Sequence, residues 1–246
     1  MPMTPRERVL TTLNHEEPDR VPLVIGVSNA TEIKMEPYQQ IKQILGVQAP
    51  DDYLYDWPEL GTAEIDEETL CRLQGDVRGV LDLEPEEVRQ QQREREPHTD
   101  CIDSWGSGQV EIEPGQWCPG VHPLKLARTA DDLELYPGWP DMSDPTRVAH
   151  VREQSKRLAE ENTYAILATP WLLFPFERAH AMQGMESYLL NMALDQDFAR
   201  AMLVKIAGYC KELMGRFLQE LDENVDMIKI GDDLGTQKSL MISPKM

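Results

Sequence analysis

The order of helical and strand-like patterns in the second half of the chain limits the fold most strongly. A helical pattern over 144–162 is followed by the apolar stretch "YAILATP", by helical pieces that divide at Gly184, and by a long amphipathic helix from Phe198 to Leu221. The stretch "DMIKI" then reads as the next strand. Strands that alternate with helices form parallel sheets through right-handed crossovers. This order predicts an α/β fold.

The first half of the chain opens with the same kind of alternation. Thr4, Pro5 and Glu7 have the spacing of a capping box with proline at the first helical position, and "RVPLVIGV" follows as a buried strand. Short helices are predicted over 38–45 and from Asp66 to residue 74. Taken together, the patterns predict parallel strands near 21–27, 76–80, 164–169 and 226–230.

The segment 84–143 has a different composition, rich in Pro, Gly, Trp and charged residues. Long irregular segments inside a compact domain are usually functional loops or excursions. Alternation within "GQVEIEPGQW" predicts a β-hairpin there. We interpret residues 1–246 as a single domain with a long excursion at 84–143.

Charge and hydropathy exclude several classes of partner. The formal net charge of −20 repels phosphate backbones and anionic lipid, so we expect no nucleic acid and no membrane as partners. No apolar run approaches the ~20 residues needed to cross a bilayer. The N-terminal stretch lacks the apolar core of a signal peptide, and a cytoplasmic location is therefore predicted.

The cysteines are scattered and include no C-x-x-C pair, which predicts free thiols in a reducing compartment. A zinc site built from Cys101 and Cys118 with His98 or His122 is an alternative, although these spacings fit no compact ligand pattern. The methionines at 182, 185, 192 and 202 follow helical spacing and are interpreted as core packing. His180 is interpreted as a structural residue.

Candidate site residues follow the predicted strands, because ligands of α/β folds bind at the carboxyl ends of parallel strands. Each of the four predicted strands has such a stretch at or just beyond its end. The candidates for substrate binding are Asn29 in "SNATE", Arg78 beside Asp82, Trp171 in "TPWLL" and Gln237 in "GDDLGTQ". Trp171 has the alternative role of a core residue.

The adjacent carboxylates of Asp232 and Asp233 are the sharpest signal and are predicted to be catalytic. Such a pair can bind a cation, accept protons or hold a polar substrate. Since neighbouring side chains of a strand point in different directions, one carboxylate can face a cavity while the other caps a helix. In the alternative reading, Asp233 only caps the following turn and Gly235 relieves strain there.

Several stretches together resemble the uroporphyrinogen decarboxylase superfamily, and the resemblance runs from end to end of the chain. The first and last stretches carry the most specific patterns. The matching stretches are "TPRERVLTTLNHEEPDRVPL", "IDEETLCRLQGDVRGV", "DSWG", "HPLKLARTADDLELYPGWPD", "GMESYLLNMALDQDFARAMLVKI" and "DMIKIGDDLGTQKSLMISP". The resemblance implies a (β/α)8 barrel of the TIM type and either decarboxylase or methyltransferase activity.

The methyltransferase-type members are the closer match. The true decarboxylases of the family hold their polycarboxylate substrate with arginines after the first strand, whereas "VIGVSNATEIK" contains none. The resemblance therefore implies transfer of a methyl group between a corrinoid, such as methylcobalamin, and a thiol or other acceptor, with a corrinoid protein as a partner. It also implies zinc, with ligands beyond residue 246. Porphyrinogen decarboxylation and a non-catalytic half-barrel are the alternatives.

The length of the chain adds a further expectation. An eight-unit barrel needs about 250 residues even with short loops, and this chain uses nearly that length on about four strand–helix units. We therefore interpret it as the N-terminal part of a barrel. Half a barrel exposes an unpaired strand edge, which predicts association as a homo-oligomer or with a complementary barrel half.

Overall fold

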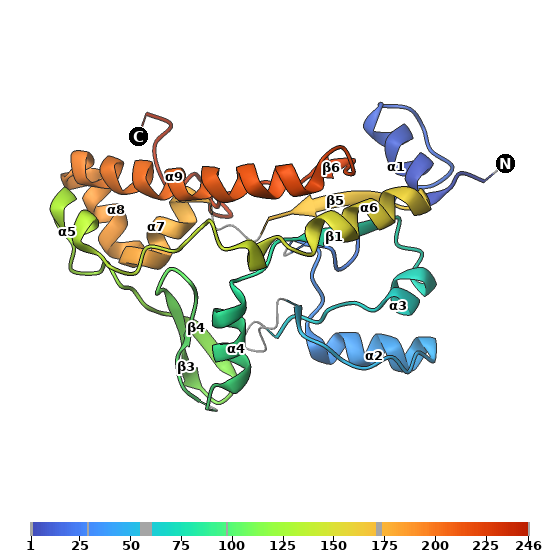
Figure 1. The fold of residues 1–246 in the computed structure, drawn as a ribbon, viewed down its shortest axis with the longest axis horizontal. Coiled ribbons are helices and arrows are strands. Elements are labelled where there is room, and N and C mark those ends of the chain that lie inside the picture. Colours follow the sequence, from blue (N-terminus) through green and yellow to red (C-terminus); the bar gives the residue numbers. More distant parts are fainter. Residues whose placement is uncertain (1, 29, 55–60, 97, 171–173, 246) are drawn as a thin grey trace. The chain divides into compact units, whose positions relative to one another are not determined.

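The computed structural model describes residues 2–28, 30–54, 61–96, 98–170 and 174–245 (Figure 1). The chain divides into two compact units, each made of three segments. Unit 1 comprises Met1–Arg89, Pro145–Trp171 and Arg216–Lys229, and unit 2 comprises Gln90–Asp144, Leu172–Gly215 and Ile230–Met246. The predicted α/β class is confirmed. The predicted single domain stays a prediction.

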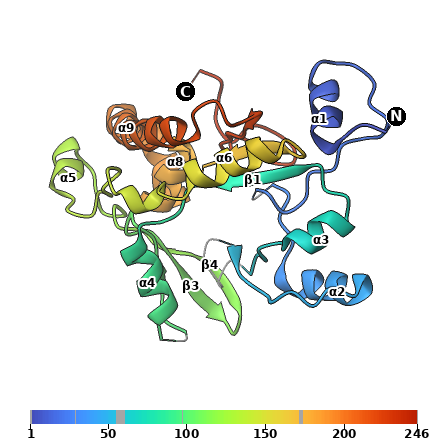
Figure 2. The same ribbon diagram turned by 45° about the vertical axis from the view of Figure 1, so that its right-hand side comes forward.

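Unit 1 contains a parallel sheet of β1 (Val77–Leu81), β5 (Ala165–Thr169) and β6 (Met227–Ile228), in the order β1-β5-β6. The register pairs Val77 with Ala165 and Leu167 with Met227. Helix α6 (Val151–Glu161) packs against β1 and β5 (Figures 1 and 2). The parallel pairing predicted from the sequence is confirmed for these three strands. Within the described residues the sheet is open and no barrel closes.

The strand predicted at 21–27 is wrong. The segment runs beside β1, where the Asp76 N–H donates to the Leu23 carbonyl at 2.8 Å. However, the Leu23 N–H is taken by the Asp76 side chain at 2.7 Å, and Pro22 has no N–H to donate. Gly26, at φ 66°, then turns the chain so that its N–H donates to Thr31. A ladder of backbone hydrogen bonds therefore does not form here.

The capping signals in unit 1 act as predicted. Helix α1 (Pro5–Leu13) begins with the expected capping box of Thr4 and Glu7. Asp66 caps α3 (Glu67–Arg72) and accepts from the Thr69 N–H at 3.0 Å. Helices α3 and α2 (Met35–Leu45) pack together (Figure 2), around a small core of Tyr38, Ala63, Ile65 and Leu70. The core between α1 and the sheet consists of Val9, Val27, Val77 and Ala165.

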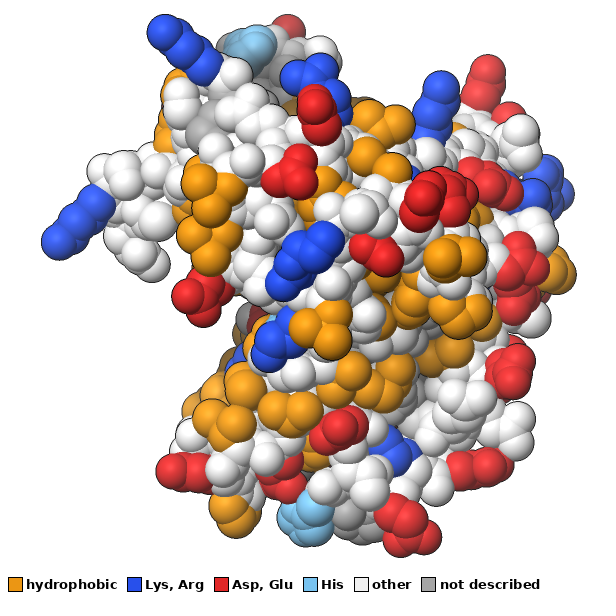
Figure 3. Space-filling view, turned by 90° about the vertical axis from the view of Figure 1, so that its left-hand side faces the viewer, with side chains coloured by type: hydrophobic (Ala, Val, Ile, Leu, Met, Phe, Trp, Pro, Cys, Tyr) orange, Lys and Arg blue, Asp and Glu red, His pale blue; other side chains and the backbone are white. Residues whose placement is uncertain are grey.

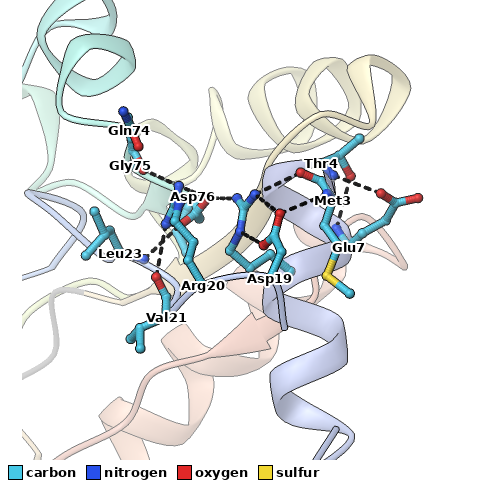
Figure 4. Close-up of polar contacts among 12 residues, drawn as sticks. Met3, Thr4, Glu7, Asp19, Arg20, Val21, Leu23, Gln74, Gly75 and Asp76 are labelled. Carbon is cyan, nitrogen blue, oxygen red and sulfur yellow. Dashed lines mark hydrogen bonds and ion pairs between the residues drawn. The ribbon is translucent and has the colours of Figure 1, made fainter. Parts of the chain in front are cut away.

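A network of charged groups ties the start of the chain to the amino end of β1 (Figure 4). The Asp76 side chain is fully buried and accepts hydrogen bonds from Arg8 at 2.5 Å and Arg20 at 2.7 Å, in addition to the Leu23 N–H. Arg8 also pairs with Asp19 at 2.5 Å. A buried carboxylate is stable only when it is paired and hydrogen-bonded, and Asp76 meets both conditions. The network therefore anchors α1 and the segment after it.

Unit 2 contains the small antiparallel sheet of β2 (Cys101–Ile102), β3 (Gly108–Glu113) and β4 (Gln116–Val121). Strands β3 and β4 form the hairpin predicted from "GQVEIEPGQW", which is confirmed. Helix α4 (Glu86–Glu94) crosses from unit 1 into unit 2, and α5 (Ala130–Leu135) lies later in unit 2. The segment 84–143 thus contains regular elements of its own.

The remaining helices follow β5. They are α7 (Pro175–Gln183), α8 (Met185–Leu194) and α9 (Gln196–Leu221), with the predicted break at Gly184, whose φ is 84°. Phe198, Met202 and Ile206 are buried along α9, as its periodicity predicts. The helix predicted over 144–162 is shorter than expected, since it consists of a 3-10 turn at Pro145–Arg147 followed by α6. None of the described helices combines the length and the apolar character needed to cross a membrane.

Candidate functional site

The site begins with the first turn of α7, which lacks a cap of its own. Phe174 occupies the N-cap position with extended backbone and has no side-chain acceptor to offer. The carboxylate of Asp232 fills this role from the segment after β6. Its oxygens accept from the Phe176 N–H at 3.0 Å and the Glu177 N–H at 2.9 Å. These are the amide groups that a capping side chain normally takes, and the helix dipole favours negative charge there.

One turn further along α7, His180 lies among aromatic rings. Its ring centroid is 4.2 Å from that of Phe176 and 5.6 Å from that of Tyr188, both in edge-on geometry. The Nε2 atom is buried and has no hydrogen-bond partner among the described residues. Burial lowers the pKa of His180, while the nearby charges of Asp232 and Asp233 act in the opposite direction. The imidazole is therefore neutral at pH 7.

The other ionisable groups of this interior keep their protons at neutral pH. Burial raises the pKa of the Tyr188 phenol, and the charge of Asp232 adds to this effect. Burial also raises the pKa of the Cys210 thiol to about 11. A thiol with such a pKa is a poor nucleophile, because the thiolate is the reactive form. Of His180, Tyr188 and Cys210, His180 is thus the group that can accept a proton at neutral pH.

A second polar contact holds α7 in place through Arg178. The Arg178 guanidinium, 2% exposed, forms an ion pair with Asp103 and lies 4.7 Å from the ring centroid of Trp105. Asp103 in turn accepts from the N–H groups of Trp105 and Ser107, each at 2.9 Å. Trp105 is 3% exposed, so it belongs to the core. The "DSWG" stretch is therefore a turn that orients a carboxylate toward α7.

The arrangement is suited to proton transfer. A neutral imidazole with a free nitrogen can remove a proton from a donor such as a thiol, and a neighbouring carboxylate stabilises the imidazolium that results. The cap contacts fix the position of Asp232 relative to α7, which carries His180. The geometry thus provides a positioned base with a charge partner from a segment distant in the sequence.

Two of the other predicted site residues lie on the surface beside Asp232, and two lie outside the described residues. Asp233 is exposed beside Asp232, and its carboxylate accepts from the Gly235 N–H at 3.4 Å, as the turn-capping reading predicted. Gln237 is exposed in the same segment. Asn29 and Trp171 lie outside the described residues. The catalytic and substrate-binding roles of all these residues stay predictions.

Arg78 belongs to unit 1, whereas Asp232, Asp233 and Gln237 belong to unit 2. Its guanidinium is 3.5 Å from the ring centroid of Tyr164 and forms two hydrogen bonds to Glu67, at 2.7 and 2.8 Å. The same group donates to the carbonyls of Gly75 and Val77, toward the amino end of β1. The described contacts of Arg78 are thus structural ones.

Sequence reasoning missed the contact between Arg178 and Asp103 and the aromatic surroundings of His180, whose interpretation as a structural residue stays a prediction. The spacing of Phe176 and His180 by one helical turn was a usable signal, since residues four apart on a helix lie side by side. A second signal was Phe174, because a helix start without a local acceptor requires a cap from elsewhere. Arg178 and Asp103 lie 75 residues apart in the sequence, and no local sequence pattern connects them.

Among the described residues, no group of three or more His, Cys, Asp or Glu side chains has the geometry to hold a metal ion. The zinc alternative built on Cys101, Cys118 and a histidine therefore does not form in the described part of the chain. Cys101 instead donates to Gln92 at 2.9 Å, and a ring nitrogen of His122 contacts the Ala181 carbonyl at 2.8 Å.

Comparison with known proteins adds no assignment. No family model, no curated protein and no solved structure matches the chain.

Proposed function

We propose that the chain is a methyltransferase of the uroporphyrinogen decarboxylase-like superfamily, which moves a methyl group between a corrinoid and a thiol or another acceptor. The observation that carries the proposal is the resemblance of its first and last stretches to that superfamily. The parallel order β1-β5-β6 with intervening helices agrees with the first units of a (β/α)8 barrel. We place the protein in the cytoplasm, with a corrinoid protein as its partner.

In this proposal His180 is the base that activates the acceptor. The S–H bond of the thiol breaks, and the proton passes to the Nε2 atom of His180, which is buried and has no hydrogen-bond partner among the described residues. The sulfur electron pair forms the new bond to the methyl group. The corrinoid substrate supplies that methyl group and retains the electron pair of the broken bond. Because a free thiol has a pKa of about 8.5, a positioned neutral base is needed at pH 7.

Asp232 and Asp233 support this step electrostatically. Their charges raise the proton affinity of His180 against the effect of burial. Asp232 also holds the first turn of α7, which carries the imidazole. Asp233 and Gln237 are exposed and free of core packing, so they are available to contact a substrate. No step is assigned to zinc, because the described residues do not form a site for it.

The test is anaerobic incubation of the protein with methylcobalamin and a small thiol, followed by the absorbance change of the corrinoid. We expect demethylation by the wild-type chain and a loss of about 10²-fold in rate for His180→Gln, the size typical of a general base. The matched control is His122→Gln, since a ring nitrogen of His122 already contacts a backbone carbonyl. This control should retain the rate.

The same experiment separates the alternatives. Release of carbon dioxide from a porphyrinogen, without corrinoid demethylation, would replace the proposal by the decarboxylase reading. No turnover of either substrate by folded protein would support the non-catalytic reading. Equal rates for wild type and His180→Gln would remove His180 from the mechanism even if methyl transfer occurs.

A further inference from the structure

A groove on α8 and α9 combines apolar walls with positive charge. It has a volume of about 380 Å³. The apolar part is formed by Met192 on α8 and by one face of α9, where Ala199, Leu203 and Val204 lie at helical spacing. Arg200 on α9 and Lys245, from the segment after β6, add two cations. Small-molecule sites commonly have volumes of ~300–1,000 Å³ and this mixture of apolar surface and a few polar groups.

The two cations of the groove lack anionic partners. Neither the Arg200 guanidinium nor the Lys245 ammonium forms a salt bridge or a side-chain hydrogen bond with another described residue. In contrast, the neighbouring Lys205 on α9 pairs with Glu134 at 2.7 Å. In a chain of net charge −20, acidic groups are abundant enough to pair with most cations. Two unpaired cations in one groove therefore favour an anionic ligand.

The acidic residues nearest in sequence do not neutralise these cations. Asp195, just before α9, uses its carboxylate to accept from the Phe198 N–H at 3.1 Å. Asp197 lies in the first turn of α9 and forms no ion pair with Arg200 among the described residues.

The helices that form the groove also carry exposed hydrophobic side chains. Leu194 at the end of α8 is 81% exposed, and Val204 on α9 is 66% exposed. Figure 3 views the side on which Figure 1 shows α5, α8 and α9, and hydrophobic side chains gather across it. Exposed apolar surface beside a groove is typical of a binding site for an apolar group. The groove thus offers apolar surface for a hydrocarbon tail next to two cations for an anionic head.

We propose that this groove binds an amphiphilic anion, a molecule with a carboxylate or phosphate head and a short hydrocarbon tail. The head lies between Arg200 and Lys245, since guanidinium and ammonium groups both bind these anions. The tail lies against Met192, Leu203 and Val204. Neither His180 nor Asp232 lines the groove, and so the proposal is independent of methyl transfer.

The experiment is isothermal titration calorimetry of the full chain at low ionic strength, with octanoate and octyl phosphate as probes. Octan-1-ol serves as the neutral analogue and octyltrimethylammonium as the cationic one. We expect both anions to bind, and the ratio of their affinities distinguishes a carboxylate from a phosphate ligand. The neutral and cationic analogues should bind at least about tenfold more weakly, because each lacks charged hydrogen bonds to the two cations.

Variants locate the site. Arg200→Gln and Lys245→Gln should each weaken anion binding by about threefold to tenfold, as expected for partly exposed charge pairs. Lys211→Gln is the matched control, since Lys211 is another exposed lysine of α9 that does not line the groove. Far-ultraviolet circular dichroism checks that each variant is folded.

Three results would overturn the proposal: no binding of either anion, equal binding of octan-1-ol, or the same affinity in both groove variants as in Lys211→Gln.

Discussion

Replacement of Asp76 by asparagine is the most direct test of how the fold of unit 1 is held. The side chain of Asp76 is fully buried and receives hydrogen bonds from Arg8, from Arg20 and from the Leu23 N–H. Asparagine has nearly the same shape, and thus Asp76→Asn changes the charge with little change in packing. The variant leaves the two guanidinium groups facing a neutral amide. The NH2 group of that amide is itself a donor and cannot accept their hydrogen bonds.

The expected loss of stability depends on the contacts that Arg8 and Arg20 keep in the variant. Arg8 keeps Asp19, at 2.5 and 3.0 Å, and Arg20 is 33% exposed, so water compensates part of its loss. Breaking a buried ion pair costs about 3–5 kcal/mol when the remaining charge is uncompensated. We therefore expect the lower end, about 3 kcal/mol. This is a large fraction of the ~5–15 kcal/mol by which domains are stable.

The assay is urea unfolding monitored by circular dichroism. With an m-value of about 2 kcal/mol/M, the loss lowers the urea midpoint by roughly 1.5 M. Arg20→Gln should lower the urea midpoint less than Asp76→Asn does. The double variant should lose less unfolding free energy than the sum of the two single losses, because each substitution removes the same ion pair. A midpoint for Asp76→Asn within about 0.3 M of wild type would refute the view that this network anchors α1 to the sheet.

Three other outcomes follow from the same contacts. Asp232→Ala should lower stability by about 1–2 kcal/mol in urea unfolding through loss of the α7 cap, whereas Asp233→Ala should change it by less than about 0.5 kcal/mol. Burial lowers the pKa of His180, so the contribution of the neutral imidazole to stability is complete above its ordinary pKa of about 6.5 and declines as the pH falls below that value. In thermal melts, the stability of His180→Gln should therefore depend less on acid pH than that of the wild type. An unchanged pH dependence would contradict the buried neutral form. The hydrogen bond from Arg8 is the chief cause that lowers the pKa of Asp19 to about 2. The contribution of Asp19 to stability is therefore present above about pH 4 and is lost as the pH falls toward 2. Asp19→Asn should make the stability depend less on pH in this acid range.

Local signals in the sequence predicted most helices and the parallel pairing of the sheet. The capping box at Thr4, the cap at Asp66 and the break at Gly184 depend on residues a few positions apart, and the structure confirms all three. The strand at 21–27 could not be judged in this way. Its ladder is interrupted by the side chain of Asp76, which lies 53 residues from Leu23 in the sequence. Propensity alone does not reveal such a competitor.

The candidate site was predictable only in part, for the same reason. The adjacent acids at 232 and 233 were identified from the sequence, and one of them does cap a helix. The sequence does not show that the amide groups capped by Asp232 belong to Phe176 and Glu177, which lie 56 and 55 residues earlier. Nor does it show that His180 lies beside Tyr188 with a free nitrogen, because that depends on how α7 and α8 pack.

Asp232 caps α7, and in the proposed function its charge also supports His180; a variant at Phe174 can separate these two effects. Asp232→Asn weakens the cap and removes the charge near His180, so a loss of activity by itself does not distinguish the two effects. Phe174 is at the N-cap with φ −69° and ψ 165°, an extended conformation typical of capping residues, and Phe174→Ser supplies a local acceptor for the same amide groups. In Phe174→Ser with Asp232→Asn, we expect stability to recover by about 1 kcal/mol, while methyl transfer stays low and its acid limb moves to lower pH. Recovery of full activity together with stability would show that Asp232 acts only as a helix cap, and the charge near the imidazole would then have no part in the chemistry.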